Sequence, residues 1–239
     1  MNKFDIHTIK KFPKIELHCH LDGSVSGLQV YENVKLLGIN ATKDEILNKI
    51  IAPEICQDLT EYLSCFEWLT KCLKNPTLIF LAIEDICRQA IEENIIYLEL
   101  RFSPYHLSNN KFTMKQVVEA VIEAVNKMKD KYPLKIGIIL CLMRGREESV
   151  NNQVIELANQ FRDKIVGLDL AGNESKYPTK IYLKQLAFIK DLEIPFTIHA
   201  GETGNFDNIR DAILAGAKRI GHGIAAKKSE EVVSLIRER

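Results

Sequence analysis

The sequence predicts an α/β fold with a parallel sheet, because short β-rich runs alternate with longer helical patterns along its 239 residues. The β-rich runs are nearly continuous in Ile, Val and Leu, as strands buried on both faces should be. Strand–helix alternation of this kind implies right-handed crossovers. The pattern alone fits a doubly wound sheet or an incomplete (β/α)8 barrel.

Each expected strand ends in polar residues. The six runs are Ile15–Gly23, Ile95–Pro104, Lys135–Arg144, Ile165–Glu174, Pro195–Glu202 and Arg219–Gly223. Helices are expected between them: Thr113 and Gln116 form a capping-box pattern, and Asp207 can cap the helix before the sixth strand. The first connection, roughly residues 24 to 94, is long enough for several helices, and insertions of this kind often cover a site.

Composition narrows the function classes. Lys+Arg and Asp+Glu are equal at 32 each, so no net charge points to DNA, RNA or an anionic membrane as a partner. The N-terminus lacks the apolar segment of a signal peptide, and no apolar run is long enough to span a membrane. The six cysteines form no Cys-x-x-Cys pair, which favours reduced thiols in the cytoplasm. Oligomeric state leaves no signal in the sequence.

Four of the six histidines stand at the ends of expected strands, namely His18, His20, His199 and His222. Residues i and i+2 of a strand point to one face, so the first two can share a ligand. Each piece has an ordinary reading: His-x-His occurs by chance, Glu202 could cap a helix, and His222 could be a turn residue. Their combination on three strand ends favours one site, because the carboxyl ends of barrel strands converge.

Imidazoles and a carboxylate that converge on a cavity suit zinc-dependent hydrolysis. Neutral imidazoles hold Zn2+ at about 2.0–2.1 Å and leave a position for water, whose pKa the ion lowers to about 7. A nearby glutamate can then act as a general acid, and a histidine that does not bind the metal can orient or deprotonate the water.

Five strings occur in order along nearly the whole chain: IELHCHLDGS, YLELRFSP, GLDLAGNE, TIHAGE and RIGHG. As a set they resemble the adenosine deaminase family. The resemblance implies an elaborated (β/α)8 TIM-type barrel of the amidohydrolase superfamily, with a helical insertion after strand 1 and one catalytic Zn2+ per chain.

The resemblance also implies roles for the residues at the strand ends. His18, His20 and His199 resemble the metal ligands. Glu202 resembles the acid that protonates purine N1 while hydroxide adds at C6, and His222 resembles the residue that handles the attacking water. The implied reaction is hydrolytic deamination of adenosine or 2′-deoxyadenosine to the inosine form and ammonia, in purine salvage.

Further residues resemble the substrate pocket. Asp22 resembles the carboxylate that holds the ribose, beside His20, and Gly172 resembles the backbone donor to purine N3. Four apolar residues with the spacing i, i+3, i+4 and i+7 resemble the lid helix that covers the sugar, namely Leu59, Tyr62, Leu63 and Phe66. An ordinary helix stripe that faces the core has the same spacing.

The identity of residue 22 bears on the substrate. Relatives that act on free adenine tend to carry Glu at this position, so Asp22 favours a small-molecule purine nucleoside. No Arg/Lys cluster near the motifs would hold a nucleotide phosphate, which disfavours AMP.

The C-terminal part departs from the family pattern. The fourth protein ligand of the family is an Asp after strand 8, beside a second Asp that contacts the purine, whereas this sequence ends at Arg239 after the sixth strand. We therefore expect residues 1–239 to form a single barrel domain truncated before strands 7 and 8, with strands 1 and 6 as exposed edges. Such a chain should bind zinc poorly on its own.

Three alternatives remain at this stage. An adenine deaminase, or another amidohydrolase such as a dihydroorotase- or phosphotriesterase-like enzyme, shares the first His-x-His. The latter group typically carries a modified Lys at the end of strand 4, whereas Lys164 here precedes that strand. An inactive fragment or pseudoenzyme would explain the short C-terminus, yet every matched catalytic position is chemically intact. Deaminases that act on nucleic acid carry a Pro-Cys-x-x-Cys signature that is absent here.

Overall fold

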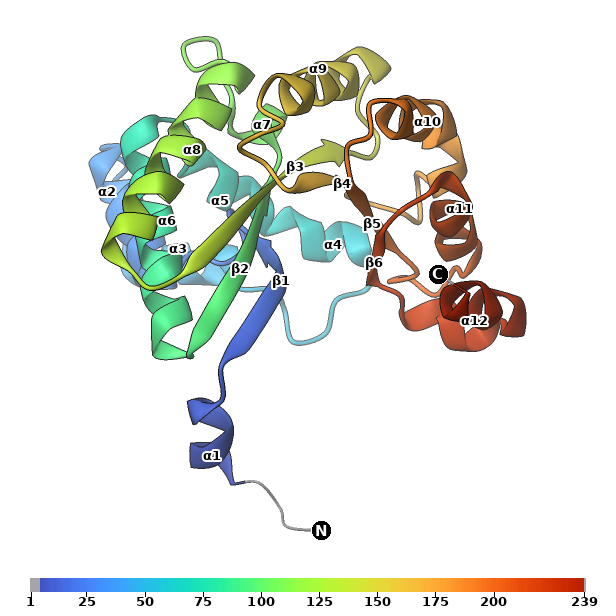
Figure 1. The fold of residues 1–239 in the computed structure, drawn as a ribbon. Helices are drawn as coiled ribbons and strands as arrows, with labels where there is room; N and C mark the ends of the chain where they lie inside the picture. The colour runs from blue at the N-terminus through green and yellow to red at the C-terminus, as the bar shows by residue number, and fades with distance from the viewer. Residues whose placement is uncertain (1–4, 239) are drawn as a thin grey trace. The chain divides into compact units, whose positions relative to one another are not determined.

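The structure, a computed structural model, describes residues 5–238 and contains six strands in the sequential order β1-β2-β3-β4-β5-β6 (Figure 1). The pairs β1–β2, β3–β4, β4–β5 and β5–β6 are parallel. Sequential parallel strands with intervening helices are the order of a (β/α)8 barrel rather than of a doubly wound sheet. The expected barrel, with six of its eight strands and a helical insertion after strand 1, is confirmed.

The strands agree with the expected runs but stop earlier at their polar ends. They are β1 (Lys14–His20), β2 (Ile95–Phe102), β3 (Lys135–Met143), β4 (Gly167–Ala171), β5 (Phe196–Ala200) and β6 (Arg219–His222).

Helices fill the remaining connections, and five of them lie between β1 and β2. The α-helices are α1 (Ile6–Lys11), α2 (Gly27–Leu36), α3 (Lys43–Ile50), α4 (Leu59–Ser64), α5 (Phe66–Lys71), α6 (Pro76–Glu92), α7 (Pro104–Leu107), α8 (Met114–Lys131), α9 (Glu148–Gln160), α10 (Leu183–Asp191), α11 (Asp207–Ala215) and α12 (Glu230–Arg237). Two 3-10 helices are η1 (Thr179–Tyr182) and η2 (Ile224–Lys228).

The contacts of the chain group into two compact units, and β3 is shared between them. Unit 1 consists of Met1–Ile51, Cys65–Phe102 and His106–Ile138. Unit 2 consists of Ala52–Ser64, Ser103–Tyr105 and Ile139–Arg239.

Unit 1 is built on the packing of α6 against α8, which lie side by side in Figure 1. The buried positions of α8 recur at helical spacing, so this helix turns an apolar stripe to its neighbour. The expected capping box is present, because Thr113 and Gln116 each satisfy a backbone N–H of the other. The buried Asp85 of α6 accepts hydrogen bonds from the backbone N–H and the hydroxyl of Ser26, which anchors the start of the insertion.

In unit 2, strands β4 and β5 are buried along their whole length, as their continuous apolar sequence predicts. The expectation that Asp207 caps α11 is wrong. Phe206 occupies the N-cap position, and Asp207 is the first residue of the helix, with its own N–H donated to the side chain of Asn205. Asp207 there contacts Arg210 at 2.7 Å and still suits the positive end of the helix dipole.

Strand β1 departs from the burial expected of it. Ile15 and Leu17 have exposed fractions of 62% and 39%, although they lie in an apolar run. Strand side chains point to the two faces of a sheet, so Ile15 and Leu17 lie on a face of β1 that other elements leave largely uncovered. β1 is also the first strand of the order, in agreement with the expected exposed edge.

Within residues 5–238, no helix is both long enough and apolar enough to cross a membrane. The six cysteines all lie in this part of the chain, and none of them forms a disulfide.

Candidate active site at the strand ends

The carboxyl end of β1 brings two histidines together within unit 1. The Nε2 atoms of His18 and His20 lie 3.2 Å apart, and the ring centroids are separated by 5.1 Å. The strand end is anchored to β2, because Arg101 donates a side-chain hydrogen bond to the carbonyl of Leu17 and its own carbonyl accepts from the N–H of Leu21. The i, i+2 alternation of a strand therefore produces a preformed histidine pair.

The spacing of this pair fits two ligands of one metal ion. Zinc binds imidazole nitrogen at about 2.0–2.1 Å, so a tetrahedral angle separates two such nitrogens by about 3.3 Å. The observed 3.2 Å between the Nε2 atoms of His18 and His20 is close to that value. A proton shared between the rings gives a similar contact, so the distance fits a metal without requiring one.

Asp22 lies two residues beyond the histidine pair and is buried, with an exposed fraction of 8%. Burial raises the pKa of its carboxyl from an ordinary 3.8 to about 6, while hydrogen bonds from the backbone of Asp22 and Gly23 act in the opposite direction. Phe66 packs close to Gly23, so close that a Cβ on that glycine would be 2.9 Å from the ring. The first residue of α5 therefore lies beside the strand end that carries Asp22.

In unit 2, β5 presents His199 against a buried carboxylate. His199 Nδ1 lies 3.0 Å from Asp169 Oδ2 and 3.1 Å from Oδ1, and both side chains are almost completely buried. A carboxylate at Nδ1 fixes the ring and its tautomer, which makes Nε2 the nitrogen suited to bind a metal.

Glu202 and His222 form a second contact in unit 2, between the loop after β5 and the end of β6. His222 Nε2 lies 3.6 Å from Glu202 Oε2, and each side chain is 27% exposed. The ring centroid of His222 is 5.2 Å from that of His199. Burial lowers the pKa of His222, an effect that Glu202 partly opposes and His199 reinforces. A lowered pKa favours the neutral imidazole, which can accept a proton.

Gly172 follows β4 with a φ of +101°, a conformation that residues with a Cβ rarely adopt. The next residue, Asn173, donates a hydrogen bond of 3.1 Å to the hydroxyl of Thr60 on α4. This bond fixes α4 to the end of β4. Three of the four expected lid residues belong to α4, namely Leu59, Tyr62 and Leu63.

The expected lid stripe is not one helix. A turn at Cys65 separates α4 from α5, so Phe66 starts a new helix. Tyr62 is 41% exposed, and no residue of α4 is buried, which agrees with a covering segment better than with a core helix.

Sequence reasoning gave no role to three buried charged residues of unit 2: Asp169, Arg144 and Glu174. Arg144 donates to the carbonyls of His199, at 2.8 Å, and Tyr177, at 2.7 Å. Burial lowers its pKa, and the charges of Glu174 and Asp169 oppose that shift. Asp169 lies inside β4 and Arg144 directly follows β3, so a charged residue within or directly after an apolar run is the signal that could have found these two. Glu174 lies three residues beyond β4 and gives no such signal.

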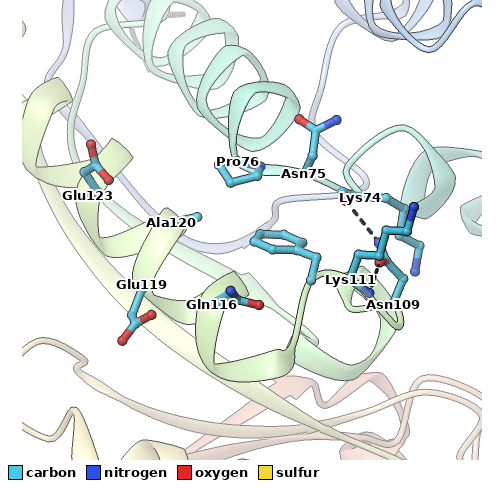
Figure 2. A pocket seen from close by; sticks show the side chains of 10 residues that line it. Lys74, Asn75, Pro76, Asn109, Lys111, Gln116, Glu119, Ala120 and Glu123 are labelled. Atoms are coloured by element: carbon cyan, nitrogen blue, oxygen red, sulfur yellow. Dashed lines mark hydrogen bonds between the residues drawn. The ribbon is translucent and has the colours of Figure 1, made fainter.

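A cavity of about 560 Å3 lies in unit 1 at the start of α6 and beside α8, away from every residue named above as a site candidate (Figure 2). Several of its polar side chains form hydrogen bonds with backbone groups. Lys74 donates to the carbonyls of His106 and Ser108, Asn75 caps α6, and Gln116 belongs to the capping box of α8. We therefore interpret this cavity as a crevice between helices.

The barrel order of the strands and the histidines at the ends of β1, β5 and β6 define the class, an α/β barrel with a histidine-rich set of strand ends. Residues 13–239 match the profile of the family described as adenosine deaminase. The chain therefore belongs to the adenosine deaminase family, a family of hydrolytic deaminases, which confirms the resemblance.

Relatives of similar sequence carry the same name. Adenosine deaminase of Enterococcus faecalis is 36% identical over 234 residues, which make up 97% of this chain and 69% of the relative. Adenosine deaminase of Lactococcus lactis is 37% identical over 228 residues, or 93% of this chain and 64% of the relative. The chain thus spans about two thirds of the length of these relatives.

Solved structures share the fold at lower identity. An adenine deaminase from Arthrobacter aurescens has a TM-score of 0.84 at 19% identity, covering 93% of this chain and 68% of its own. An N6-mAMP deaminase from Arabidopsis has a TM-score of 0.83 at 24% identity, covering 98% and 71%. A zinc-bound amidohydrolase from Burkholderia ambifaria has a TM-score of 0.87 at 18% identity, covering 99% and 66%.

Proposed function

We propose that residues 1–239 act as one barrel domain of a zinc-dependent adenosine deaminase, which converts adenosine or 2′-deoxyadenosine to the inosine form and ammonia in purine salvage. The observation that carries the proposal is the His18–His20 pair, whose Nε2 separation of 3.2 Å suits two ligands of one zinc ion. The adenosine deaminases of similar sequence support the reaction.

We assign the metal to His18, His20 and His199. The first two are set by the pleat of β1, and the carboxylate of Asp169 orients the third. When bound, zinc would lower the pKa of a water molecule to about 7 and so supply a nucleophile at neutral pH. The zinc-bound relative from Burkholderia ambifaria is consistent with this choice of metal.

Proton transfer falls to the pair of Glu202 and His222. The neutral imidazole of His222, favoured by its lowered pKa, accepts the proton of the attacking water. Glu202 delivers a proton to purine N1 as the water oxygen adds at C6. Their contact of 3.6 Å supports roles in which the acid and the base act on the same small substrate.

Substrate binding is assigned to Asp22, Gly172 and the residues of α4 with Phe66. Asp22 would accept hydrogen bonds from the ribose hydroxyls. Gly172 would offer its backbone N–H to purine N3. Its positive φ gives the peptide an orientation that a residue with a Cβ would rarely allow. The apolar side chains of α4 and Phe66 would cover the sugar.

Free adenine is the second candidate substrate, because an adenine deaminase shares the fold. A ribose-binding Asp22 favours the nucleoside. AMP-type substrates are a third case, since the Arabidopsis relative is named for N6-mAMP.

The test uses this chain fused to the C-terminal third of the Enterococcus faecalis relative, which we call the extended chain. Loaded with zinc, it should convert adenosine to inosine, followed by ultraviolet absorbance, and should act at least tenfold less efficiently on adenine and AMP. Chelation should abolish the activity, and added zinc should restore it.

His199→Ala should lose both zinc and activity, whereas His106→Ala, a histidine of α7 outside the site, should retain them. If the extended chain turned over adenine in preference to adenosine, the assigned substrate would be wrong and adenine would take its place. Activity in His199→Ala would refute the metal site.

A further inference from the structure

Glu174 is a buried carboxylate that accepts four hydrogen bonds. It follows β4 by three residues and has an exposed fraction of only 1%. Its Oε2 accepts from the backbone N–H of Gly201, at 2.8 Å, and from Asn208 Nδ2, at 3.1 Å. Its Oε1 accepts from the backbone N–H and the hydroxyl of Thr203, at 2.7 Å and 3.0 Å.

Two of these donors flank Glu202 directly. The N–H groups of Gly201 and Thr203 bind different oxygens of one carboxylate, so the peptide that carries Glu202 is held on both sides. The loop is also tightly packed, since Gly201 has a φ of +77° and a Cβ there would lie 2.4 Å from Ile209. Glu202 itself stays partly exposed beside His222.

The site requires a charged acceptor at position 174. Both oxygens face two N–H or O–H donors, and a glutamine would turn its NH2 group toward one of these pairs. Arg144 provides positive charge nearby and donates to the carbonyl of His199 and to the hydroxyl of Thr179. Asn208 links the two charged residues, because it donates to Glu174 and accepts from the N–H of Thr179. Both oxygens of the buried Glu174 carboxylate are therefore hydrogen-bonded, which reduces the cost of burying its charge.

We propose that Glu174 is a positioning residue for the reaction, which holds Glu202 at the distance from the purine that proton transfer requires. The inference rests on the proposed function, because Glu202 is the proton donor only in that reaction. Glu174 acts through the amides of residues 201 and 203 and does not touch the substrate. A displacement of about 1 Å in such a group can lower a rate by about a hundredfold.

The experiment compares Glu174→Gln with Glu148→Gln in the extended chain with zinc. Glu148 is an exposed glutamate of the same unit that pairs with Lys184 on the surface, so it controls for the chemical change. Glu174→Asp keeps the charge at shorter reach and serves as the conservative variant if Glu174→Gln folds poorly. The readouts are kcat and KM for adenosine, bound zinc, and hydrogen exchange at the amides of Gly201 and Thr203.

In Glu174→Gln, exchange at these amides should rise about tenfold or more, the factor expected from losing a hydrogen bond to a charged group. The kcat should fall about ten- to a hundredfold. KM and zinc content should stay within about twofold of the parent, Glu174→Asp should be intermediate, and Glu148→Gln should match the parent.

Three results would overturn the proposal. Unchanged exchange at both amides would show that Glu174 does not clamp the loop. Faster exchange with unchanged kcat would show a clamp without a role in the reaction. Loss of zinc in proportion to kcat would show that Glu174 supports the metal site instead.

If the parent extended chain fails to deaminate adenosine, the proposed function fails and the positioning role fails with it. The exchange rates at Gly201 and Thr203 would still decide whether Glu174 clamps the loop.

Discussion

Two carboxylates of the candidate site experience opposite surroundings. Asp22 is buried in unit 1 and has a raised pKa, whereas Glu202 in unit 2 is partly exposed and lies beside a histidine. A buried carboxyl group is destabilised in its charged form, and a hydrogen-bonding substrate can offset that effect. The two residues therefore make different predictions.

Replacement of the acid should separate binding from turnover. In the extended chain, Glu202→Gln should retain zinc and bind adenosine with nearly unchanged affinity, because the amide keeps the size of the side chain. The rate should fall by about 10²–10⁴-fold, the usual contribution of a general acid. Single-turnover kinetics with a zinc assay measure both quantities, and a variant with full rate but weaker binding would contradict the role.

Asp22 should make the metal-free chain less stable as pH rises. The folded state holds the carboxyl proton up to a pH of about 6, whereas the unfolded state releases it near the ordinary pKa of 3.8. The stability associated with this proton is complete below about pH 4 and is lost as pH rises through 6, by roughly 3 kcal/mol at most. Asp22→Asn should therefore unfold at higher urea concentration than the parent at pH 7.5, and the two should agree near pH 4. A less stable Asn variant at pH 7.5 would contradict this reading of the burial.

The four histidines that sequence analysis matched to the site, together with Asp22, Gly172 and Glu202, lie at or near strand ends in the structure, because strand ends can be recognised from apolar runs. The network of Glu174 with Gly201, Thr203 and Asn208 could not be found in this way. Its members are 27 to 34 residues apart, and no local period relates them. Such bonds exist only once the fold has brought two loops together.

At the scale of elements, helices with a long period were predictable and short ones were not. The 18-residue α8 shows its stripe and its capping box plainly. The six-residue α4 and α5 are too short for periodicity to locate the turn between them. The start of α11 was placed one residue late, because Asp207 resembles a cap although Phe206 takes that position.

The capping box of α8 gives an element-level prediction. Thr113→Ala removes the acceptor for the N–H of Gln116 and should lower the free energy of unfolding by about 0.5–2 kcal/mol. Asn126→Ala, on an exposed position of the same helix, should not lower it, because alanine has the higher helix propensity. Urea titrations of both variants measure the difference, and equal loss in the two would rule out the cap as the cause.

At the scale of the whole molecule, the alternation of strands and helices left both a doubly wound sheet and a barrel open, and only the resemblance to a known family implied the barrel order that the structure confirms. The apolar run of β1 predicted burial on both faces, whereas Ile15 and Leu17 are exposed on this strand, which was expected to form an edge of the sheet. Composition indicates which side chains favour burial, and the packing of other elements on the faces of a strand decides whether they are buried.

The chain tested alone should show what the remaining strands contribute. With added zinc, residues 1–239 should bind the metal more weakly than the extended chain and deaminate adenosine little or not at all. Three histidines can hold zinc, but the family's aspartate ligand would be missing and the exposed edge of β1 should promote self-association. Adenosine turnover and light scattering of the two proteins provide the comparison, and equal activity would show that six strands suffice.

The end of β6 has a consequence for attempts to improve this protein. His222 has a φ of +63°, and Gly223 follows it at +65°. A histidine in this conformation costs on the order of 1–3 kcal/mol relative to a relaxed backbone, whereas glycine adopts it freely. Laboratory selection for heat resistance alone should therefore favour His222→Gly. The selected variants would be more stable proteins that have lost the imidazole assigned to the attacking water. Such a screen must therefore also select for deaminase activity in every round.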